Sequence, residues 1–282
     1  MQAEKAADTV KICEVFDLSR AGIYAAKKRA NTPKAICATT VALKSAFEES
    51  GQTYGTRRLQ QALQQHHGIK IGRHRVRTLM RKHQLKTVWK RKFTATTDSK
   101  HTSPVFENVL NRDFSPAKPN QAWTSDITYI RTASGWLYLA VVMDLFSRKI
   151  IGWASSSTMP AELVCNALSM AIAHRQPDKG LIVHSDRGSQ YVSHLYRDLL
   201  TTQRCIGSMS RKGNCWDNAP MERFFLNLKM ESIWRRDYAN HRDAKADISH
   251  YIVNFYNSKR LHSTLGYLSP SNFELKMTAH KP

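Results

Sequence analysis

The order of predicted strands and helices between residues 122 and 234 constrains the fold of this chain more than any other sequence feature. Three β-rich runs separated by short turns come first and predict an antiparallel meander: Ala122 to Ile130, Trp136 to Phe146 and Lys149 to Ser156. Helical and strand-like segments then alternate: Pro160 to His174, Gly180 to Ser185, Tyr191 to Gln203, Ile206 to Ser210 and Asn218 to Trp234. This order predicts an α/β domain over residues 119–234.

A meander followed by alternation is the element order of the ribonuclease-H-like fold. In that fold the first and fourth strands lie side by side, so Asp126 and Asp186 are expected to be neighbours. Glu222 lies on the last helix, at the edge of an apolar stripe formed by Met221, Phe224, Phe225 and Leu228. We therefore predict that Asp126, Asp186 and Glu222 converge on one site.

Two nearby residues have alternative interpretations. If the loop between the first two strands has an even number of residues, Asp126 shares a sheet face with Val141, and Asp144 points to the other face. A β-bulge would reverse this, so Asp144 stays an alternative acid. Lys229 follows Glu222 by about 10 Å along the same helix edge and is either a DNA contact or an exposed helical lysine.

Three converging carboxylates suit metal-dependent chemistry on nucleic-acid phosphate. Attack on a phosphodiester needs a deprotonated nucleophile and a stabilised leaving oxygen, and two hard cations about 4 Å apart serve both ends. We expect two Mg²⁺ ions, with Mn²⁺ as a substitute, bound by Asp126, Asp186 and Glu222.

The charge of the chain supports a nucleic-acid partner. The chain carries 43 Lys and Arg residues against 22 Asp and Glu residues, a formal net charge of +21. An excess this large indicates a polyanion as partner. Residues 1–118 hold 23 of the basic residues and only 9 of the acidic ones. DNA affinity is therefore expected to be concentrated in this first part.

Two helical modules are predicted there. Residues 1–45 contain a short helix at Val10 to Phe16 and a second at Arg20 to Arg29 with Ser19 as N-cap, which resembles a helix-turn-helix; a plain helical hairpin is the alternative. Residues 46–93 form a second helix-turn-helix-like module, with 12 basic residues and no acidic one from residue 50 to 97. The absence of acids favours phosphate contact over a merely solvated face. The expected DNA contacts of this module are Arg57, Arg58, Arg73, Arg75 and Arg77.

The remaining segments are less specific. Residues 94–118 are rich in Thr, Ser, Pro and Asn and are expected to be a linker. Residues 235–282 are expected to be a C-terminal helical extension, with a helix near Ala244 to Asn257, that packs on the core or on another subunit. A DNA contact stays open for the polar residues Asn257, Arg260 and His262.

The loop before Glu222 is a second candidate for substrate contact. Arg211 and Lys212 are expected to hold the DNA strand near the reacting phosphate. Trp216 either stacks on an unpaired base or packs the loop onto the sheet. His184 is expected to be a strand residue behind Asp186 rather than a metal ligand.

Several classes of protein are disfavoured by composition. The five cysteines include no Cys-x-x-Cys pair, so neither a disulfide framework nor a zinc site is indicated. No apolar run approaches the roughly 18 residues of a membrane span, and the first residues are charged rather than signal-like. We expect a cytoplasmic, nucleoid-associated protein without a membrane partner.

Motifs in order along most of the chain carry a family resemblance. They are Trp123 to Ile130, Asp144 to Arg148, His184 to Tyr191, Ser210 to Ala219, Phe255 to Asn257, Arg260 to Ser263 and Leu265 to Pro270. Together they closely resemble the second-frame DDE transposases of the IS-three family of bacterial insertion sequences. The resemblance implies an integrase-like core with Asp126, Asp186 and Glu222 as its triad and Lys229 as the accompanying basic residue.

The resemblance also implies a reaction and partners. Such enzymes cleave one strand at an element end and use the freed 3′-hydroxyl to attack another strand, without a covalent protein intermediate. The expected partners are double-stranded DNA at element ends and target, further copies of the chain in a dimeric or higher synaptic complex, and an upstream-frame protein or fusion. Unlike retroviral integrases, the chain shows no paired-His, paired-Cys zinc module at its front.

Two other functions fit parts of the sequence. A catalytically inactive DNA-binding regulator of transposition would keep the basic front, although it would not need three correctly placed acids. A purely hydrolytic nuclease would use the same metals with water as nucleophile, so the products discriminate it from a transposase.

Overall fold

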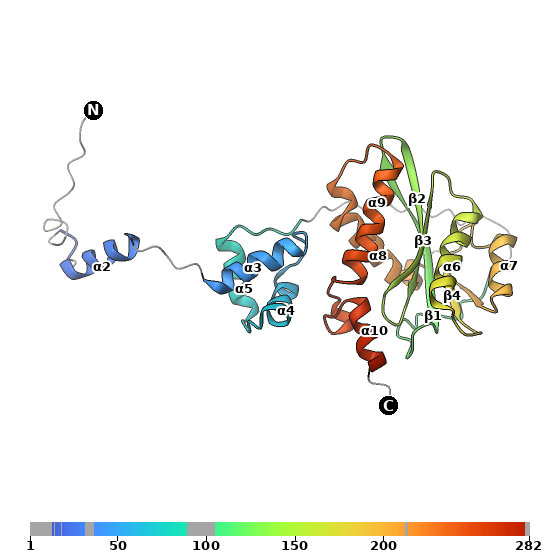
Figure 1. Ribbon diagram of the computed structural model, residues 1–282, viewed down its shortest axis with the longest axis horizontal. Helices are drawn as coiled ribbons and strands as arrows, with labels where there is room; N and C mark the ends of the chain where they lie inside the picture. Colours follow the sequence, from blue (N-terminus) through green and yellow to red (C-terminus); the bar gives the residue numbers. More distant parts are fainter. Residues whose placement is uncertain are drawn as a thin grey trace.

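The computed structural model describes residues 13, 15–17, 19–31, 37–88, 105–211 and 214–279. A helical module and a larger α/β domain make up most of this part, and helix α2 (Arg20–Asn31) stands apart from both (Figure 1). The Oγ atom of Ser19 accepts a hydrogen bond from the Gly22 amide at 3.0 Å, so Ser19 caps α2 as expected. Most of the helix expected at Val10 to Phe16 lies outside the described residues.

A five-stranded mixed sheet forms the centre of the α/β domain. Its strands lie in the order β3-β2-β1-β4-β5 and are β1 (Ala122–Thr132), β2 (Gly135–Asp144), β3 (Ile150–Ser156), β4 (Ile182–Ser185) and β5 (Ile206–Met209). The first three strands pair antiparallel, whereas β4 runs parallel to both β1 and β5. The ribonuclease-H-like arrangement predicted from the element order is therefore confirmed.

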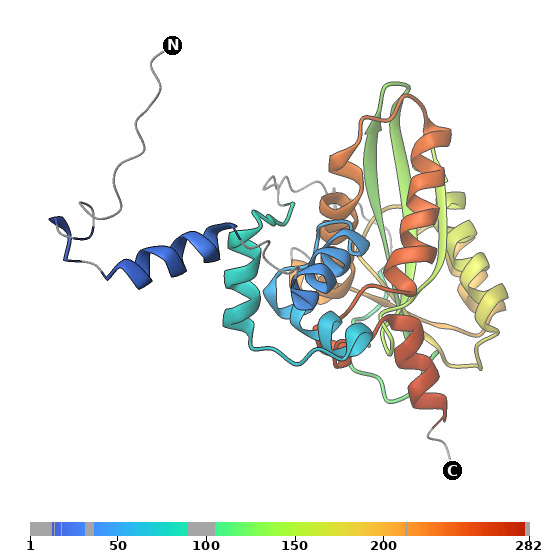
Figure 2. The same ribbon diagram turned by 60° about the vertical axis from the view of Figure 1, so that its left-hand side comes forward.

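Helices cover both faces of the sheet (Figure 1, Figure 2). On one face, α6 (Ala161–Arg175) and α7 (His194–Thr202) pack against a core that includes Trp123, Ala140 and Val142. On the other face, α8 (Ala219–Glu231) and α9 (His241–His250), which continues as a π-helical segment (Tyr251–Asn257), pack against Leu139, Val141 and Met143. The alternation of β2 side chains between two helical layers explains its nearly continuous burial.

The part of the expected linker that the structure describes belongs to the α/β domain. Phe106 packs on β5 where Gly207 has no side chain, and a Cβ atom on Gly207 would lie 2.8 Å from the Phe106 ring. The amide of Met209 donates to the Glu107 carbonyl at 3.2 Å, and the Leu110 amide donates to Ser208 Oγ at 3.1 Å. Composition alone favoured a linker because these few anchoring residues are spaced among polar ones.

The helical module consists of α3 (Ala38–Glu49), α4 (Thr56–His67) and α5 (Arg73–Lys82). Its core is built from Leu43, Phe47, Leu59, Leu63, Val76 and Leu79. The domain boundary expected at residue 45 falls inside α3. Leu43 and Phe47 lie on either side of that residue and share one buried face of the helix. The module therefore begins near residue 38.

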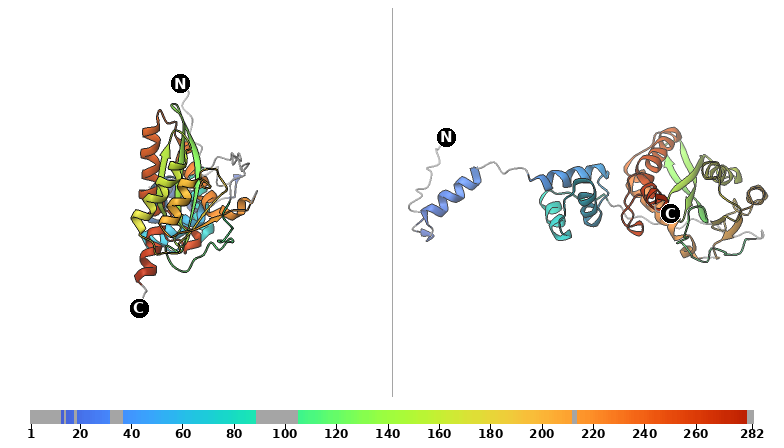
Figure 3. Two further views of the ribbon diagram at one scale, coloured as in Figure 1. Left: turned by 90° about the vertical axis from the view of Figure 1, so that its right-hand side faces the viewer. Right: turned by 60° about the horizontal axis from the view of Figure 1, so that its bottom comes forward.

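The C-terminal segment packs on the core, the first of the two alternatives expected for it. Tyr251, Ile252 and Tyr256 are buried beside α8, and a further helix, α10 (Pro270–Ala279), ends the described part of the chain (Figure 3). Asn257 pairs with the beginning of β3: its Oδ1 accepts from the Ile150 amide at 2.9 Å, and its Nδ2 donates to the Ile150 carbonyl at 2.8 Å. None of the described helices is long and apolar enough to cross a membrane.

Candidate active site and nucleic-acid interface

Strand β1 places Asp126 on the sheet face covered by α8. Asp126 pairs with Val141 across the β1–β2 hairpin, which turns through the two residues Ala133 and Ser134. The expected even-numbered loop is thus present. Because Val141 packs against α8, the Asp126 side chain lies on that side as well.

Strand β4 brings Asp186 to the same edge. Thr124 of β1 pairs in parallel with His184 of β4, and Asp126 and Asp186 each follow two residues later. The Oδ1 atom of Asp186 accepts from the Gly188 amide at 2.9 Å, and that of Asp126 accepts from the Ile127 amide at 2.7 Å. Both aspartates are half-buried. The expected proximity of these two acids follows directly from the strand order.

Helix α8 supplies the third acid. Glu222 lies in its first turn and is exposed, whereas Met221, Phe224, Phe225 and Leu228 are buried against the sheet as the apolar stripe predicted. Lys229 is half-buried, and its Nζ atom lies 4.9 Å from the centre of the Tyr129 ring of β1. The alternative of an exposed helical lysine is therefore wrong for Lys229.

The three acids influence one another electrostatically. Burial raises the pKa of Asp126 well above its usual range, and the negative charges of Asp186 and Glu222 raise it further, against the opposing effects of the Ile127 amide and Lys229. Partial loss of hydration also raises the pKa of Glu222. Within the described part of the chain, no three His, Cys, Asp or Glu side chains lie close enough together to enclose a metal ion. Asp126 thus lies among other negative charges, and Lys229 is one of the groups that oppose their effect.

Buried polar residues lie near the two aspartates. The hydroxyl groups of Tyr191 and Ser125 are 3.1 Å apart, and both residues are fully buried. His184 lies between Ser208 Oγ at 2.9 Å and Ser210 Oγ at 3.1 Å, and burial lowers its pKa to about 4. His184 is therefore a neutral core residue, as expected. Sequence spacing gave no indication of the role of Tyr191.

Asp144 has a structural role on the opposite face. Its carboxylate accepts from the amides of Asn120 and Phe146 and pairs with Arg175 of α6 at 2.8 Å. Its side chain is fully buried. The hairpin parity therefore excluded Asp144 from the acid cluster correctly.

The loop before α8 is held by a buried acid that the sequence did not reveal. Asp217, in the short helix η1 (Cys215–Asn218), accepts hydrogen bonds from Arg112 at 2.7 Å, from Asn108 at 3.0 Å and from the Arg211 amide at 2.9 Å. No local sequence pattern pointed to its partners Arg112 and Asn108, which lie 105 and 109 residues earlier in the chain.

This loop presents Trp216 to solvent. The Trp216 side chain is 69% exposed, so the alternative in which it packs the loop onto the sheet is wrong. The Arg211 guanidinium is exposed and donates to Asn111. Lys212 lies outside the described residues.

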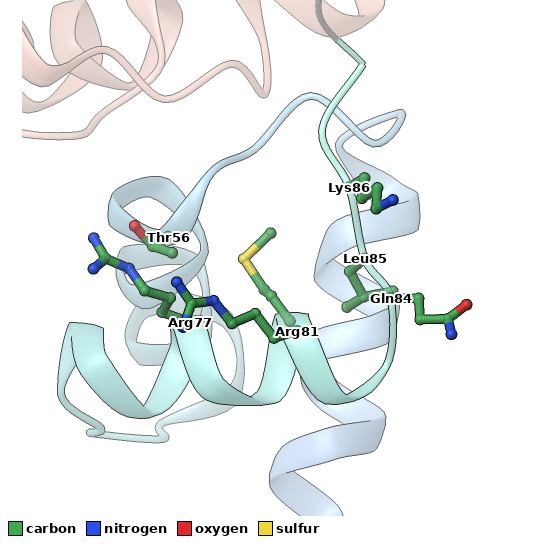
Figure 4. A pocket seen from close by; sticks show the side chains of 7 residues that line it. Thr56, Arg77, Arg81, Gln84, Leu85 and Lys86 are labelled. Atoms are coloured by element: carbon green, nitrogen blue, oxygen red, sulfur yellow. The ribbon is translucent and has the colours of Figure 1, made fainter.

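The helical module presents a cationic surface. Arg57 of α4 and Arg73, Arg75 and Arg77 of α5 are exposed, while Val76, Leu79 and Met80 fill the module core. A pocket of about 320 Å³ opens on this surface and is lined by Thr56, Arg77, Met80, Arg81, Gln84, Leu85 and Lys86. Figure 4 shows Arg77 and Arg81 extending from the same side of α5 near Thr56 of α4.

Arg58 differs from the other arginines expected to contact DNA. It is half-buried, its Nε atom donates to the Leu261 carbonyl at 3.0 Å, and its guanidinium lies 5.6 Å from the centre of the Tyr54 ring. Arg58 thus makes an internal contact, which the run of basic residues around it did not predict.

The polar stretch of the C-terminal segment also has internal roles. Arg260 is 2% exposed and pairs with Glu231, and Asn257 pairs with β3. Burial, together with nearby arginine charges, lowers the pKa of His262 to about 2. The DNA contact left open for Asn257 and Arg260 is therefore wrong, because their polar groups are buried and satisfied.

Comparisons with known proteins agree with this architecture. An HTH-like domain model matches residues 38–93, and two Integrase core domain models match residues 116–215 and 204–270. The chain is 43% identical over 267 residues to the 31 kDa protein of insertion element IS600 from Shigella sonnei, covering 94% of this chain and 98% of that protein. It is 41% identical over 274 residues to transposase InsF of insertion sequence IS3A from Escherichia coli K12, covering 95% and 94% of the two chains.

A solved structure shows the same fold at low identity. It is the simian T-cell lymphotropic virus intasome in complex with the PP2A regulatory subunit B56 gamma, with 15% identity and a TM-score of 0.50. The match covers 86% of this chain and 75% of that chain.

Proposed function

The chain belongs to the IS-three family of insertion-sequence transposases, and from this premise we propose that Asp126, Asp186 and Glu222 are the catalytic carboxylates of DNA strand cleavage and 3′-hydroxyl strand transfer. Family membership makes it a transposase with an integrase core, which acts on DNA as a polynucleotidyl transferase. We propose the catalytic role of these three residues and the two steps of cleavage and strand transfer.

One observation carries the assignment. The parallel pairing of β1 with β4 sets Asp126 and Asp186 side by side on the face that α8 covers, and Glu222 in the first turn of α8 raises the pKa of Asp126 through its charge. Other acids in the described domain, such as Asp144, Asp217 and Glu231, are instead paired with arginines. Placing like charges close together is costly to a fold, which favours a functional reason for keeping these three acids.

The donor set fits hard divalent cations. All three candidate ligands are carboxylates, which Mg²⁺ and Mn²⁺ prefer, and the ammonium group of Lys229 opposes the effect of the neighbouring charges on Asp126. The exposed side chain of Glu222 has the freedom to turn toward the two aspartates. Two bound ions would activate the attacking hydroxyl and neutralise the leaving oxygen.

The protein itself supplies position and charge. Asp126 and Asp186 are held by strand pairing and by backbone amides, so they act as fixed ligands rather than as nucleophiles. The ammonium group of Lys229 lies over the Tyr129 ring and interacts electrostatically with Asp126, so it is placed to contact a phosphate that enters the site. Asp217 holds the adjoining loop so that Trp216 projects into solvent, where an unpaired base can stack on it.

DNA binding away from the acids is assigned to the helical module and to the loop. Arg57, Arg73, Arg75 and Arg77 contact phosphates or bases at the element end, and Arg211 and Lys212 hold the reacting strand. Arg58 is left out of this set because of its internal contact. Two ends must be brought together, so a dimer or higher synaptic assembly is proposed, with an upstream-frame partner or fusion as a further component.

A magnesium-dependent assay with labelled element-end DNA tests the proposal. The DNA is taken from the sequences that flank the gene, and the wild type is compared with Glu222→Gln. Joined products that disappear in the variant while binding persists support the assignment. Cleavage without joining would identify a hydrolytic nuclease, and binding without either product would identify a regulator or a protein that needs its fused partner.

A further inference from the structure

Residues 259–261 lie between the helical module and the helix that carries Glu222. Leu261 is 4% exposed and packs in the same cluster as Leu43, Phe47 and Leu59 of the module. Its neighbour Arg260 pairs with Glu231, the last residue of α8. Three consecutive residues therefore contact both units of the protein.

The module holds this segment through two side chains at the beginning of α4. The Tyr54 hydroxyl accepts from the Leu261 amide at 2.8 Å and donates to the Lys259 carbonyl at 3.2 Å. Arg58 donates to the Leu261 carbonyl at 3.0 Å, with its guanidinium over the Tyr54 ring. Both backbone polar groups of Leu261 thus bond to the module that we propose binds DNA.

The same segment is fixed to α8 by a buried ion pair. The guanidinium of Arg260 binds both carboxylate oxygens of Glu231 at 2.8 Å, and the Tyr251 hydroxyl donates to Oε2 of Glu231 at 2.7 Å. The Glu231 and Arg260 side chains are only 7% and 2% exposed. The charge of Arg58 also contributes to lowering the pKa of Glu231, so the two sides of the segment interact electrostatically.

We propose that residues 259–261 couple the DNA-binding module to the catalytic helix, with Tyr54, Arg58, Arg260 and Glu231 as positioning residues. The proposal rests on the proposed function. Helix α8 is 13 residues long and rigid, so holding its last residue also fixes the direction of its first turn, where Glu222 lies. The position in which the module binds its DNA would then determine which phosphate enters the site of Asp126, Asp186 and Glu222.

The variant Tyr54→Phe tests this coupling without burying an unpaired charge. It removes both hydrogen bonds of the hydroxyl and keeps the ring under Arg58, whereas Glu231→Gln would leave Arg260 uncompensated and impair folding. The matched control is Gln65→Ala, which removes a hydrogen bond between the same module and the Tyr267 carbonyl at the exposed rim of the interface.

Three quantities are measured: the Kd for element-end DNA, the positions of cleavage at nucleotide resolution, and the folded fraction. For Tyr54→Phe we expect a Kd within about 2-fold of wild type, cleavage spread over several neighbouring phosphates, and a fall in correctly joined product of about 10-fold, the size expected for two ordinary hydrogen bonds. Gln65→Ala should cleave at the wild-type position.

Two results would overturn the coupling. One is a Tyr54→Phe variant that cleaves at the wild-type positions and gives the wild-type yield of joined product. The other is a Tyr54→Phe variant whose yield of joined product falls only in proportion to its folded fraction, with the cleavage positions unchanged. Hydrogen exchange keeps the test independent of catalysis: DNA binding should slow exchange at the last amides of α8 in the wild type and not in Tyr54→Phe. If the wild type binds DNA without cleaving it, as a regulator or a protein that needs its fused partner would, this exchange result still supports or overturns the coupling.

Discussion

The two ends of α8 carry glutamates in opposite environments. Glu222, in the first turn, is exposed and adds negative charge to two neighbouring aspartates. Glu231, the last residue, is buried, and its two oxygens are bound by Arg260. One helix thus separates a charge that the fold leaves uncompensated from a charge that it satisfies.

The same contrast holds for other acids of the described domain. Asp217 and Glu231 have arginine partners and lowered pKa values. Asp144 also pairs with an arginine, although burial raises its pKa. Burial raises the pKa of Asp126, the charges of Asp186 and Glu222 raise it further, and Lys229 opposes them. Like charges placed close together therefore mark the candidate site more specifically than burial does.

The largest expected effect is that of Glu222→Gln on catalysis. The change keeps the size of the side chain and removes its charge, so joining should fall roughly 100- to 1000-fold, as when one pre-organised electrostatic group is lost. The folding free energy should change by less than about 0.5 kcal/mol, because Glu222 is exposed. Single-turnover joining and urea unfolding measure the two quantities, and a loss of joining below 10-fold would contradict the role given to Glu222.

Glu231→Gln should instead have its large effect on folding free energy. Removing one partner of a buried pair leaves Arg260 uncompensated and should cost about 3–5 kcal/mol of folding free energy. Because the folded-state pKa of Glu231 is lowered, its contribution is complete above the usual glutamate pKa of about 4.3 and is lost as pH falls through the folded pKa. Urea unfolding at pH 7 and at lower pH measures this, and Glu222→Gln on the same helix is the control.

Trp216→Ala should weaken binding to DNA with unpaired bases by about 1–3 kcal/mol, the usual contribution of one base stacked on an aromatic ring. Stability should not change, since the side chain is mostly exposed. Trp216→Phe keeps a stacking ring and should recover much of the affinity. Equal affinity of all three proteins for single-stranded DNA would show that Trp216 does not stack on a base.

The smallest expected effect is a gain in stability from Asp126→Asn. The folded-state pKa of Asp126 is raised, so its charged form destabilises the native state at neutral pH, and the amide removes that cost. The gain should shrink as pH falls toward the usual aspartate pKa of about 3.9, where the unfolded carboxylate is protonated as well. Thermal unfolding between pH 4 and 7 measures this gain in stability. A variant that is less stable than the wild type at pH 7 would show that the hydrogen bonding of Asp126 outweighs the repulsion.

The sequence predicted the parts of the site that local periodicity determines. Strand and helix order placed Asp126 beside Asp186, hairpin parity separated Asp144 from them, and the apolar stripe oriented α8. Each of these depends on short-range regularity, such as side-chain alternation along a strand or the helical repeat.

Contacts between distant segments were not predictable in this way. Asp217 with Arg112, and Arg260 with Glu231, are pairs whose partners are identified only once the chain is folded. The same limit explains Arg58, which lies among basic residues and is nevertheless used to hold the Leu261 backbone. Charge composition pointed to the basic helical module but could not distinguish an arginine on its surface from one in its interface.

Both edge strands of the sheet are bonded at one end to another segment of the chain. Asn257 takes the hydrogen-bonding groups of Ile150 at the beginning of β3, and residues 107–110 bond to β5 at the opposite side. Open strand edges invite pairing with other chains, which leads to runaway aggregation. The bonds at the ends of β3 and β5 shorten the strand edge that is open to addition, which favours helical faces and the nucleic acid itself as the surfaces through which copies of the chain would assemble.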